Sequence, residues 1–492
     1  MKNTTDKNNK LSLLGSISLG TGVMIGAGIF VLMGQIAELV GDLFPIAFIA
    51  GAVVVGFSSY SYVKFSNAFP SSGGVVKFLN KSYGPGTTTG FYSLLMYVSM
   101  VVSESLVAGT FGAYTLRLFP ESYAGYASTL GVGLIVVAYI VNILGNKVIG
   151  ATATFTAIIK VVGIAILAIA GLAISGFADI TGNYIPKNTE TLPQGFGFVA
   201  ALALSILAYK GFTTITNQGA DIKNPHKNLG RSIVFSILIC TLIYVALALA
   251  VAGGLSIPEI IEAKDYALAA AAKPVFGEWG SWITIGIAII ATVSGVIASI
   301  FSSSRLLAML SNMKQVPSLT KLGSLKNPAL VFTSSLAILL TVLFDLTRIA
   351  SIGAIFYLIM DIAIHWGLFR HLKNKVVFQP IIPLIAIVLD IAVLAAFLYI
   401  KYLNDPLVLI VAAIGIVLIL VAERLFMISH TDDEGNMPMG MKNTSDKNKK
   451  TYVYHFGKFY PLMRRPISYS LCILMNTNMN TDIFVEHEHE HA

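Results

Sequence analysis

The first long apolar run of the chain contains, at residues 20–30, the stretch Gly20-Thr21-Gly22-Val23-Met24-Ile25-Gly26-Ala27-Gly28-Ile29-Phe30. Four glycines fall within nine residues, near the middle of a run long enough to cross a bilayer. Glycine costs up to about 1 kcal/mol per position in a helix, so two interpretations are open. Gly22 and Gly26 let helices pack closely, as small residues four apart do. Alternatively, the helix unwinds here and its free N–H groups bind an anion such as a carboxylate.

The composition of the whole chain is that of a membrane protein. Of its 492 residues, 55% are hydrophobic and 12% are charged, and the mean hydropathy is +0.76. Soluble proteins average about 25% charged residues, so the sequence excludes a soluble globule, and it excludes a disordered chain over residues 1–423. The two cysteines, Cys240 and Cys472, imply no disulfide framework.

A helix needs about 20 apolar residues to cross a bilayer. We predict an all-α integral membrane protein with twelve transmembrane helices, near residues 12–37, 44–69, 90–118, 126–145, 150–176, 195–219, 232–254, 281–311, 329–345, 348–370, 380–400 and 405–423. Residues 1–11 form a polar N-terminus and residues 424–492 a polar tail that we expect to be disordered.

The loops between these runs carry the basic residues unevenly. With the N-terminus in the cytoplasm, 17 Lys and Arg residues fall in inside loops and 6 in outside loops. Because basic residues accumulate on the cytoplasmic side, we predict a multi-pass protein of the cell (plasma) membrane with both termini cytoplasmic. The net charge of +8 then reflects topology, and no nucleic-acid partner is expected beside the lipid bilayer.

A second interruption occurs in the sixth run, where Lys210 stands next to Gly211. The first and sixth helices occupy corresponding positions if ten helices form two inverted repeats of five. Interruptions paired in this way indicate a transporter binding site. We therefore predict a leucine-transporter-type core with helices 1 and 6 unwound. Its repeats would be 12–176 and 195–370, with helices 11 and 12 (380–423) outside them.

Five short motifs resemble, in order, those of the amino acid–polyamine–organocation (APC) permeases, and especially the prokaryotic proton-coupled amino acid transporters. They are Gly26-Ala27-Gly28-Ile29-Phe30, Phe69-Pro70-Ser71-Ser72-Gly73-Gly74, Ala208-Tyr209-Lys210-Gly211-Phe212, Ala220-Asp221-Ile222-Lys223-Asn224-Pro225, and Ser303-Ser304-Arg305 followed by Met309 and Pro317. The resemblance covers roughly residues 11–423. Leu207 departs from it where relatives often carry an aromatic gate, and Ala220 where they carry an acid.

The resemblance implies a substrate site made of backbone groups at the two interruptions. N–H groups of Ala27, Gly28 and their neighbours Ile25 and Gly26 would bind the substrate carboxylate. Carbonyl groups of Met24, Leu207 and Lys210 would bind its ammonium, and Ala208 and Gly211 belong to the same break. Such an arrangement satisfies unwound backbone and zwitterion together. Because Leu207 leaves room in the site, we expect small or medium neutral amino acids.

Lys160 lies well inside the fifth run. Relatives that work without sodium carry a lysine here, and its ammonium takes the place of a sodium ion between helices 1, 5 and 8. An ammonium mimics a cation and can lose its proton when it is removed from water. Protonation would hold helix 5 to helix 1 and to a hydroxyl of helix 8, from Ser294 or Ser299. The alternative is a lysine neutralised in a fixed pair.

Glu104 is the only acid inside the first five runs, which makes it the expected counter-charge of Lys160. Lys210 is open to two interpretations. It contributes only its carbonyl group, or its charge enters the site and favours acidic substrates.

The remaining charged groups favour structural roles. Asp361 and His365 are spaced i,i+4 and Asp390 lies one helix later. Two ligands are a weak metal signal, so neither a metal nor a cofactor is expected. In the tail, residues 441–450 repeat residues 1–10 with eight identities, which suggests a duplicated start region. The alternating Glu and His of residues 486–491 could bind a metal loosely, but a solvated charged tail is the simpler interpretation.

Three function classes compete. A membrane enzyme is disfavoured because the sequence has no G-x-S-x-G motif, and an ATP-driven pump because it has no G-x-x-x-x-G-K-[ST] motif. A non-transporting receptor leaves two broken helices unexplained. We predict a secondary active amino acid transporter, sodium-independent and coupled to protons by alternating access. An amino acid exchanger is the alternative, and the oligomeric state stays open.

Overall fold

The computed structural model describes residues 10–144, 146–175, 195–219, 221–316 and 327–429. Within these ranges the chain is helical, and one isolated β-bridge joins Leu11 to Ile222. The segments 1–9 and 430–492 lie outside the described residues, and with them the repeated sequence at 441–450 and the His-containing end. The segment 176–194 and Ala220 lie outside them as well.

The helices follow one another with short connections. Their bounds are α1 Leu13–Val40, η1 Gly41–Leu43, α2 Phe44–Ala68, α3 Gly74–Tyr83, α4 Thr87–Thr115, η2 Leu116–Leu118, η3 Glu121–Tyr126, α5 Ala127–Leu144, α6 Asn146–Ser175, α7 Phe196–Tyr209, η5 Lys210–Gln218, α8 Pro225–Gly254, α9 Ile257–Glu262, α10 Ala267–Asn312, α11 Pro328–Leu343, α12 Leu346–His371, α13 Ile381–Asn404 and α14 Pro406–Ser429.

Ten segments of the described chain are long and apolar enough to cross a membrane, so the protein is a multi-pass membrane protein. Two shorter apolar helices, Leu13–Gly26 and Pro328–Leu343, accompany them. One of the ten, Gly28–Ala68, holds the end of α1, the turn η1 and all of α2. The all-α fold class is therefore confirmed, while the count of twelve spans stays a prediction.

Burial divides the bundle into an inner and an outer set of helices. The most apolar windows of α4, α7 and α12 are 78% buried, whereas that of α14 is 17% buried. Large apolar side chains are exposed on the outer helices, for example Ile169 on α6, Leu242 on α8 and Leu418 on α14. A surface of this kind is stable against lipid tails but not against water.

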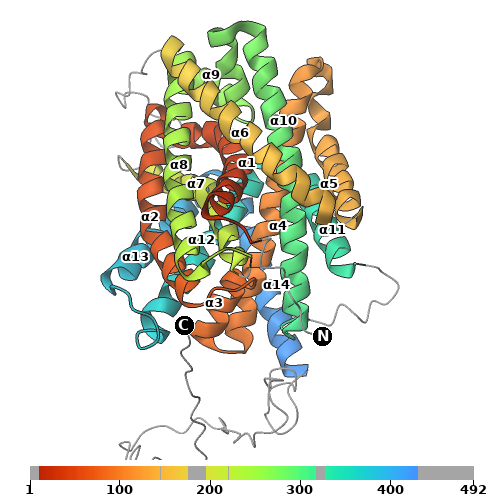
Figure 1. The fold of residues 1–492 in the computed structure, drawn as a ribbon. Coiled ribbons are helices and arrows are strands. Elements are labelled where there is room, and N and C mark those ends of the chain that lie inside the picture. The colour runs from red at the N-terminus through yellow and green to blue at the C-terminus, as the bar shows by residue number, and fades with distance from the viewer. Residues whose placement is uncertain (1–9, 145, 176–194, 220, 317–326, 430–492) are drawn as a thin grey trace, which may run out of the picture.

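The ends of the bundle are capped by two short helices that the hydropathy pattern did not predict. Figure 1 shows α3 at the lower end and α9 at the upper end. Both are amphipathic or short, so neither reaches the length of a span. The helix α10 includes a bend at Gly277, whose φ of 66° is left-handed. The apolar span predicted at 281–311 begins just after this bend.

Candidate functional site

The glycine stretch of α1 is helical throughout. α1 runs as one helix from Leu13 to Val40, so the predicted unwinding of helix 1 is absent from this structure. The alternative interpretation, close packing, accounts for the glycines. A Cβ atom on Gly28 would lie 2.6 Å from the Cα of Ala208, and one on Gly22 would lie 3.0 Å from the Cβ of Ala157. The helix also keeps its backbone groups paired, which matters where no water is available.

Helix 6 does change its form at the predicted place. The α-helix α7 ends at Tyr209, and the 3₁₀ helix η5 continues from Lys210 to Gln218. Nine residues are long for a 3₁₀ helix, which rarely exceeds three or four. The carbonyl of Leu207 accepts the N–H of Lys210, and the carbonyl of Lys210 accepts the hydroxyl of Thr213 at 3.0 Å. A 3₁₀ stretch in mid-helix often marks a hinge.

The two interruptions lie against each other, which brings together residues predicted to bind substrate. Besides the contact of Gly28 with Ala208, a Cβ atom on Gly211 would lie 2.7 Å from Met24. The hydroxyl of Tyr244, on α8, donates to the carbonyls of Met24 and Ala208 at 2.6 and 3.2 Å. Sequence reasoning missed Tyr244, because a tyrosine in an apolar run has no distinguishing pattern.

The other predicted substrate residues lie around this contact. Ile25 and Gly26 are buried in α1, and the Leu207 side chain faces Gly353 of α12. Ala27 lies within α1, and its side chain is outside the described part of the structure. Because Ala27 and Gly28 are inside a continuous helix, the carboxylate-binding role of their N–H groups stays a prediction.

Lys160 points from α6 to the glycine stretch. Its Nζ donates to the carbonyl of Gly22 at 3.2 Å, and a Cβ atom on Gly26 would lie 3.6 Å from the same Nζ and 3.7 Å from the carbonyl of Ala291 in α10. The side chain is buried. Lys160 therefore lies where α1, α6 and α10 meet, but the two hydroxyls predicted to hold it have other partners.

The two predicted hydroxyls of α10 are used elsewhere. Ser294 donates to carbonyls of its own helix, those of Ile290 and Ala291, at 2.8 and 3.2 Å. Ser299 donates to Glu104 at 3.3 Å. The prediction that either residue binds Lys160 is therefore wrong for this structure. Both serines follow the backbone of α10, whose rotation about its own axis cannot be read from the sequence.

Glu104 is paired differently from the prediction. It is fully buried on α4 and accepts hydrogen bonds from Ser299 and Ser303 of α10, while its Oε2 has no partner among the described residues. The lysine that interacts with it electrostatically is Lys210, not Lys160. The predicted pair of Glu104 with Lys160 is therefore wrong, because α10 packs between α4 and α6.

Lys210 extends to α4. Its Nζ donates to the Oγ and the carbonyl of Ser99 at 2.6 and 2.9 Å and to the Oγ of Ser103 at 3.1 Å, and lies 5.5 Å from the ring centre of Tyr357. Ser99 and Ser103 are spaced i,i+4, so they share one face of α4. That spacing was the sequence signal that could have identified them.

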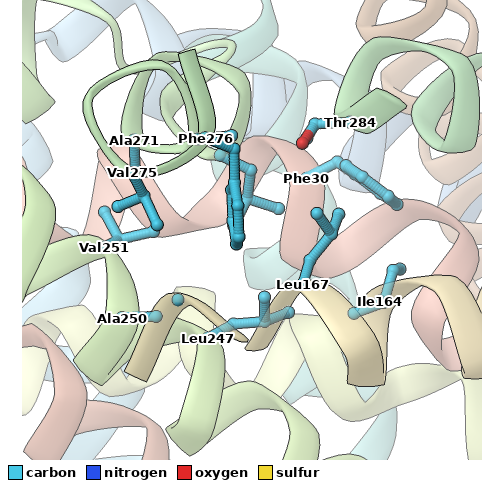
Figure 2. Close-up of a pocket in the computed structure, with 13 residues that line it drawn as sticks. Phe30, Ile164, Leu167, Leu247, Ala250, Val251, Ala271, Val275, Phe276 and Thr284 are labelled. Carbon is cyan, nitrogen blue, oxygen red and sulfur yellow. The ribbon is translucent and has the colours of Figure 1, made fainter. Parts of the chain in front are cut away.

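A small cavity of about 30 Å³ lies beside the contact of the two interruptions. Figure 2 shows side chains of α1, α6, α8 and α10 around it, among them Phe30, Leu167, Leu247 and Phe276. Thr284 supplies the only side-chain oxygen in this lining. Phe30 closes the glycine stretch, and its carbonyl accepts the hydroxyl of Tyr114 at 2.9 Å. The lining suits an apolar group and offers nothing to a charged one.

Comparison with known proteins agrees with this geometry. The sequence profile of the amino acid permease family matches residues 11–434. An uncharacterized protein of Methanocaldococcus jannaschii is 32% identical over 359 residues, which are 72% of this chain and 81% of that protein. The inner membrane transport protein YbaT of Escherichia coli is 30% identical over 370 residues, 74% of this chain and 84% of YbaT.

A third relative has a more specific name. The serine/threonine exchanger SteT of Bacillus subtilis is 24% identical over 428 residues, which cover 83% of this chain and 95% of SteT. These relatives are membrane transport proteins and not enzymes. The resemblance first seen in five short motifs is therefore confirmed over most of the sequence, and the chain belongs to the amino acid permease family of the APC superfamily.

Proposed function

We propose that this protein is a secondary active transporter that carries amino acids across the cell membrane without sodium and in symport with protons. One observation carries the proposal: the interruptions of helices 1 and 6 contact each other, and the buried ammonium of Lys160 binds the carbonyl of Gly22 beside that contact. A binding site and a titratable group thus share the same segment of α1.

The coupling mechanism follows from this contact. Protonated Lys160 attracts the carbonyl dipole of Gly22 and holds α6 to α1. A neutral amine makes a weaker hydrogen bond, so loss of the proton releases α6. If substrate binding favours the docked arrangement, proton and substrate stabilise the same state, and each raises the affinity for the other.

We further propose the topology that the sequence predicts. The segment Gly28–Ala68 is 41 residues long, enough for two passes with a turn at η1, and Leu13–Gly26 is continuous with it in α1. This gives twelve spans, with repeats at 12–176 and 195–370, helices 11 and 12 at 380–423, and both termini cytoplasmic. The 3₁₀ helix η5 supports a hinge in helix 6.

The substrate would be a neutral amino acid. Lys210, the charge that could favour an acidic substrate, is held by Ser99 and Ser103 on α4, while the cavity by Phe30 is apolar. The alternative function is exchange of one amino acid for another without proton coupling, which the name of SteT supports.

Uptake of radiolabelled amino acids into proteoliposomes tests the proposal. Symport predicts uptake into empty vesicles that rises with an inward proton gradient and is unchanged when choline replaces sodium. Exchange predicts uptake only into vesicles preloaded with an amino acid. A strict requirement for sodium, or no uptake of any amino acid, would refute the proposed function.

A further inference from the structure

A cluster of three buried ionisable side chains lies away from the contact of helices 1 and 6. Asp361 and His365 stand one turn apart on α12, and Asp390 comes from α13. All three are fully buried, and one potential ligand atom from each lies within 4.8 Å of the others. The sequence suggested only two ligands here, because Asp390 joins them through tertiary packing.

The distances in this cluster are those of metal ligands rather than of hydrogen bonds. His365 Nε2 lies 3.5 Å from Asp361 Oδ2 and 3.3 Å from Asp390 Oδ2. A charge-assisted N–H···O bond is shorter, about 2.7–2.9 Å. Two ligands on a tetrahedral zinc ion, each about 2.0–2.1 Å from the metal, are about 3.3–3.4 Å apart. The imidazole thus faces both carboxylates at the spacing that a shared cation requires.

Several ligand atoms also lack a hydrogen-bond partner. Both carboxylate oxygens of Asp390 and the Nε2 of His365 are buried without one among the described residues. A buried carboxylate with neither oxygen hydrogen-bonded is costly in a membrane interior. The Asp390 carboxylate is directed at the other two groups, so a cation held between them would satisfy it.

The opposite atoms of the ligand side chains are held from α2. Ser58 and Tyr62 donate to Asp361 Oδ2 and Oδ1, each at 2.6 Å. Ser61 Oγ lies 2.8 Å from His365 Nδ1. Metal-binding histidines commonly hydrogen-bond through their other nitrogen, and metal-binding carboxylates are likewise held by neighbouring donors. Three polar side chains of one helix therefore orient two of the ligands.

Charge balance favours a divalent ion. Two ionised carboxylates and a neutral imidazole carry a charge of −2, which a divalent cation cancels. A protonated imidazole alone would leave −1 uncompensated, and His365 is the one chargeable side chain within ion-pair distance of these aspartates in the described part of the chain. Oxygen and imidazole ligands in a small site suit Zn²⁺.

We propose that Asp361, His365 and Asp390 bind one divalent transition-metal ion of the Zn²⁺ class, which fastens α13 to α12. The site is structural, since all its ligands are buried and it lies apart from Lys160 and the glycine stretch. It would attach a helix outside the proposed repeats to the core of the protein.

The test must first remove a competing site in the tail, where His487, His489 and His491 alternate with glutamates. The parent protein is the full-length chain with these three histidines replaced by alanine. It is purified in detergent, incubated with Zn²⁺, desalted and analysed by mass spectrometry for metal content. We expect about one zinc ion per chain. A parent protein that keeps no zinc would overturn the proposal.

Two variants then assign the metal to this cluster. Asp390→Asn should lose the zinc, whereas Glu423→Gln should keep it, because Glu423 is a buried carboxylate on α14 that also lacks a hydrogen-bond partner. Ser61→Ala should weaken zinc binding by roughly 10- to 100-fold. Zinc retained in folded Asp390→Asn would show that the metal binds elsewhere and would overturn the proposal.

A gain of signal covers the case in which Asp390→Asn does not fold. Asp390→Cys keeps a side chain of similar length and supplies a thiolate. With Co²⁺ in place of zinc, this variant should show a thiolate-to-cobalt charge-transfer band in the near ultraviolet that the parent protein lacks. A variant that elutes as the parent does and shows no such band would also overturn the proposal.

Discussion

Replacing Lys160 with alanine should remove the pH dependence of uptake. The Lys160 ammonium makes a hydrogen bond of 3.2 Å to the Gly22 carbonyl in a buried site. Hydrogen bonds to charged groups contribute about 1.5–3 kcal/mol. Since 1.4 kcal/mol is a factor of ten, protonation should shift the equilibrium between docked and released α6 by roughly ten- to hundredfold. Stimulation by an inward proton gradient should fall from about that size to none.

The matched control is the other buried lysine. Lys210→Met combined with Glu104→Gln removes both charges of the second pair while leaving no buried charge alone. This double variant should keep the wild-type pH profile, because its residues lie on the far side of α10 from Lys160. Substrate binding should persist in Lys160→Ala, because the predicted carboxylate and ammonium sites are backbone groups.

The assay is initial uptake into proteoliposomes across a pH series, with choline in place of sodium and with protein incorporation measured for each variant. Identical pH profiles for wild type and Lys160→Ala would refute the reasoning and make Lys160 a structural residue. Loss of the pH dependence in the Lys210→Met, Glu104→Gln variant, but not in Lys160→Ala, would assign proton coupling to the Glu104–Lys210 pair instead.

Three further predictions test the packing of the site. Gly28→Ala should lower the thermal stability in detergent, because its Cβ would lie 2.6 Å from the backbone of Ala208 and overpacking costs about 1–3 kcal/mol. Gly26→Ala should be neutral or stabilising, since its closest neighbours are at 3.6 Å; equal melting temperatures for the two variants would contradict the close contact. Tyr244→Phe removes the hydroxyl that joins two carbonyls and should weaken the contact by about 1 kcal/mol per bond, which a thermal shift and a changed KM for uptake would reveal. Glu104→Gln alone leaves the Lys210 charge buried without its acid, so it should be less stable than the double variant; the reverse order in thermal melts would argue against their interaction.

The sequence was sufficient for properties that each segment carries by itself. Whether a run of residues crosses a bilayer depends on its own length and apolarity. For this reason predicted spans such as 44–69 and 348–370 agree closely with α2, Phe44–Ala68, and α12, Leu346–His371. The family could also be recognised, because its motifs are short and contiguous. The change of helix type at Lys210 was expected from a charge beside a glycine, which is again a local property.

Tertiary structure decided what depends on how helices rotate and pack against one another. Two interpretations of the α1 glycines were open, and only the backbone of α7 against Gly28 distinguished them. Glu104 met Ser303, 199 residues away, and Lys210 rather than Lys160, because α10 lies between α4 and α6. Asp390 likewise joined His365 only because α13 packs against α12. Hydropathy is nearly unchanged when a helix turns about its axis, whereas such a turn replaces every partner of a polar side chain.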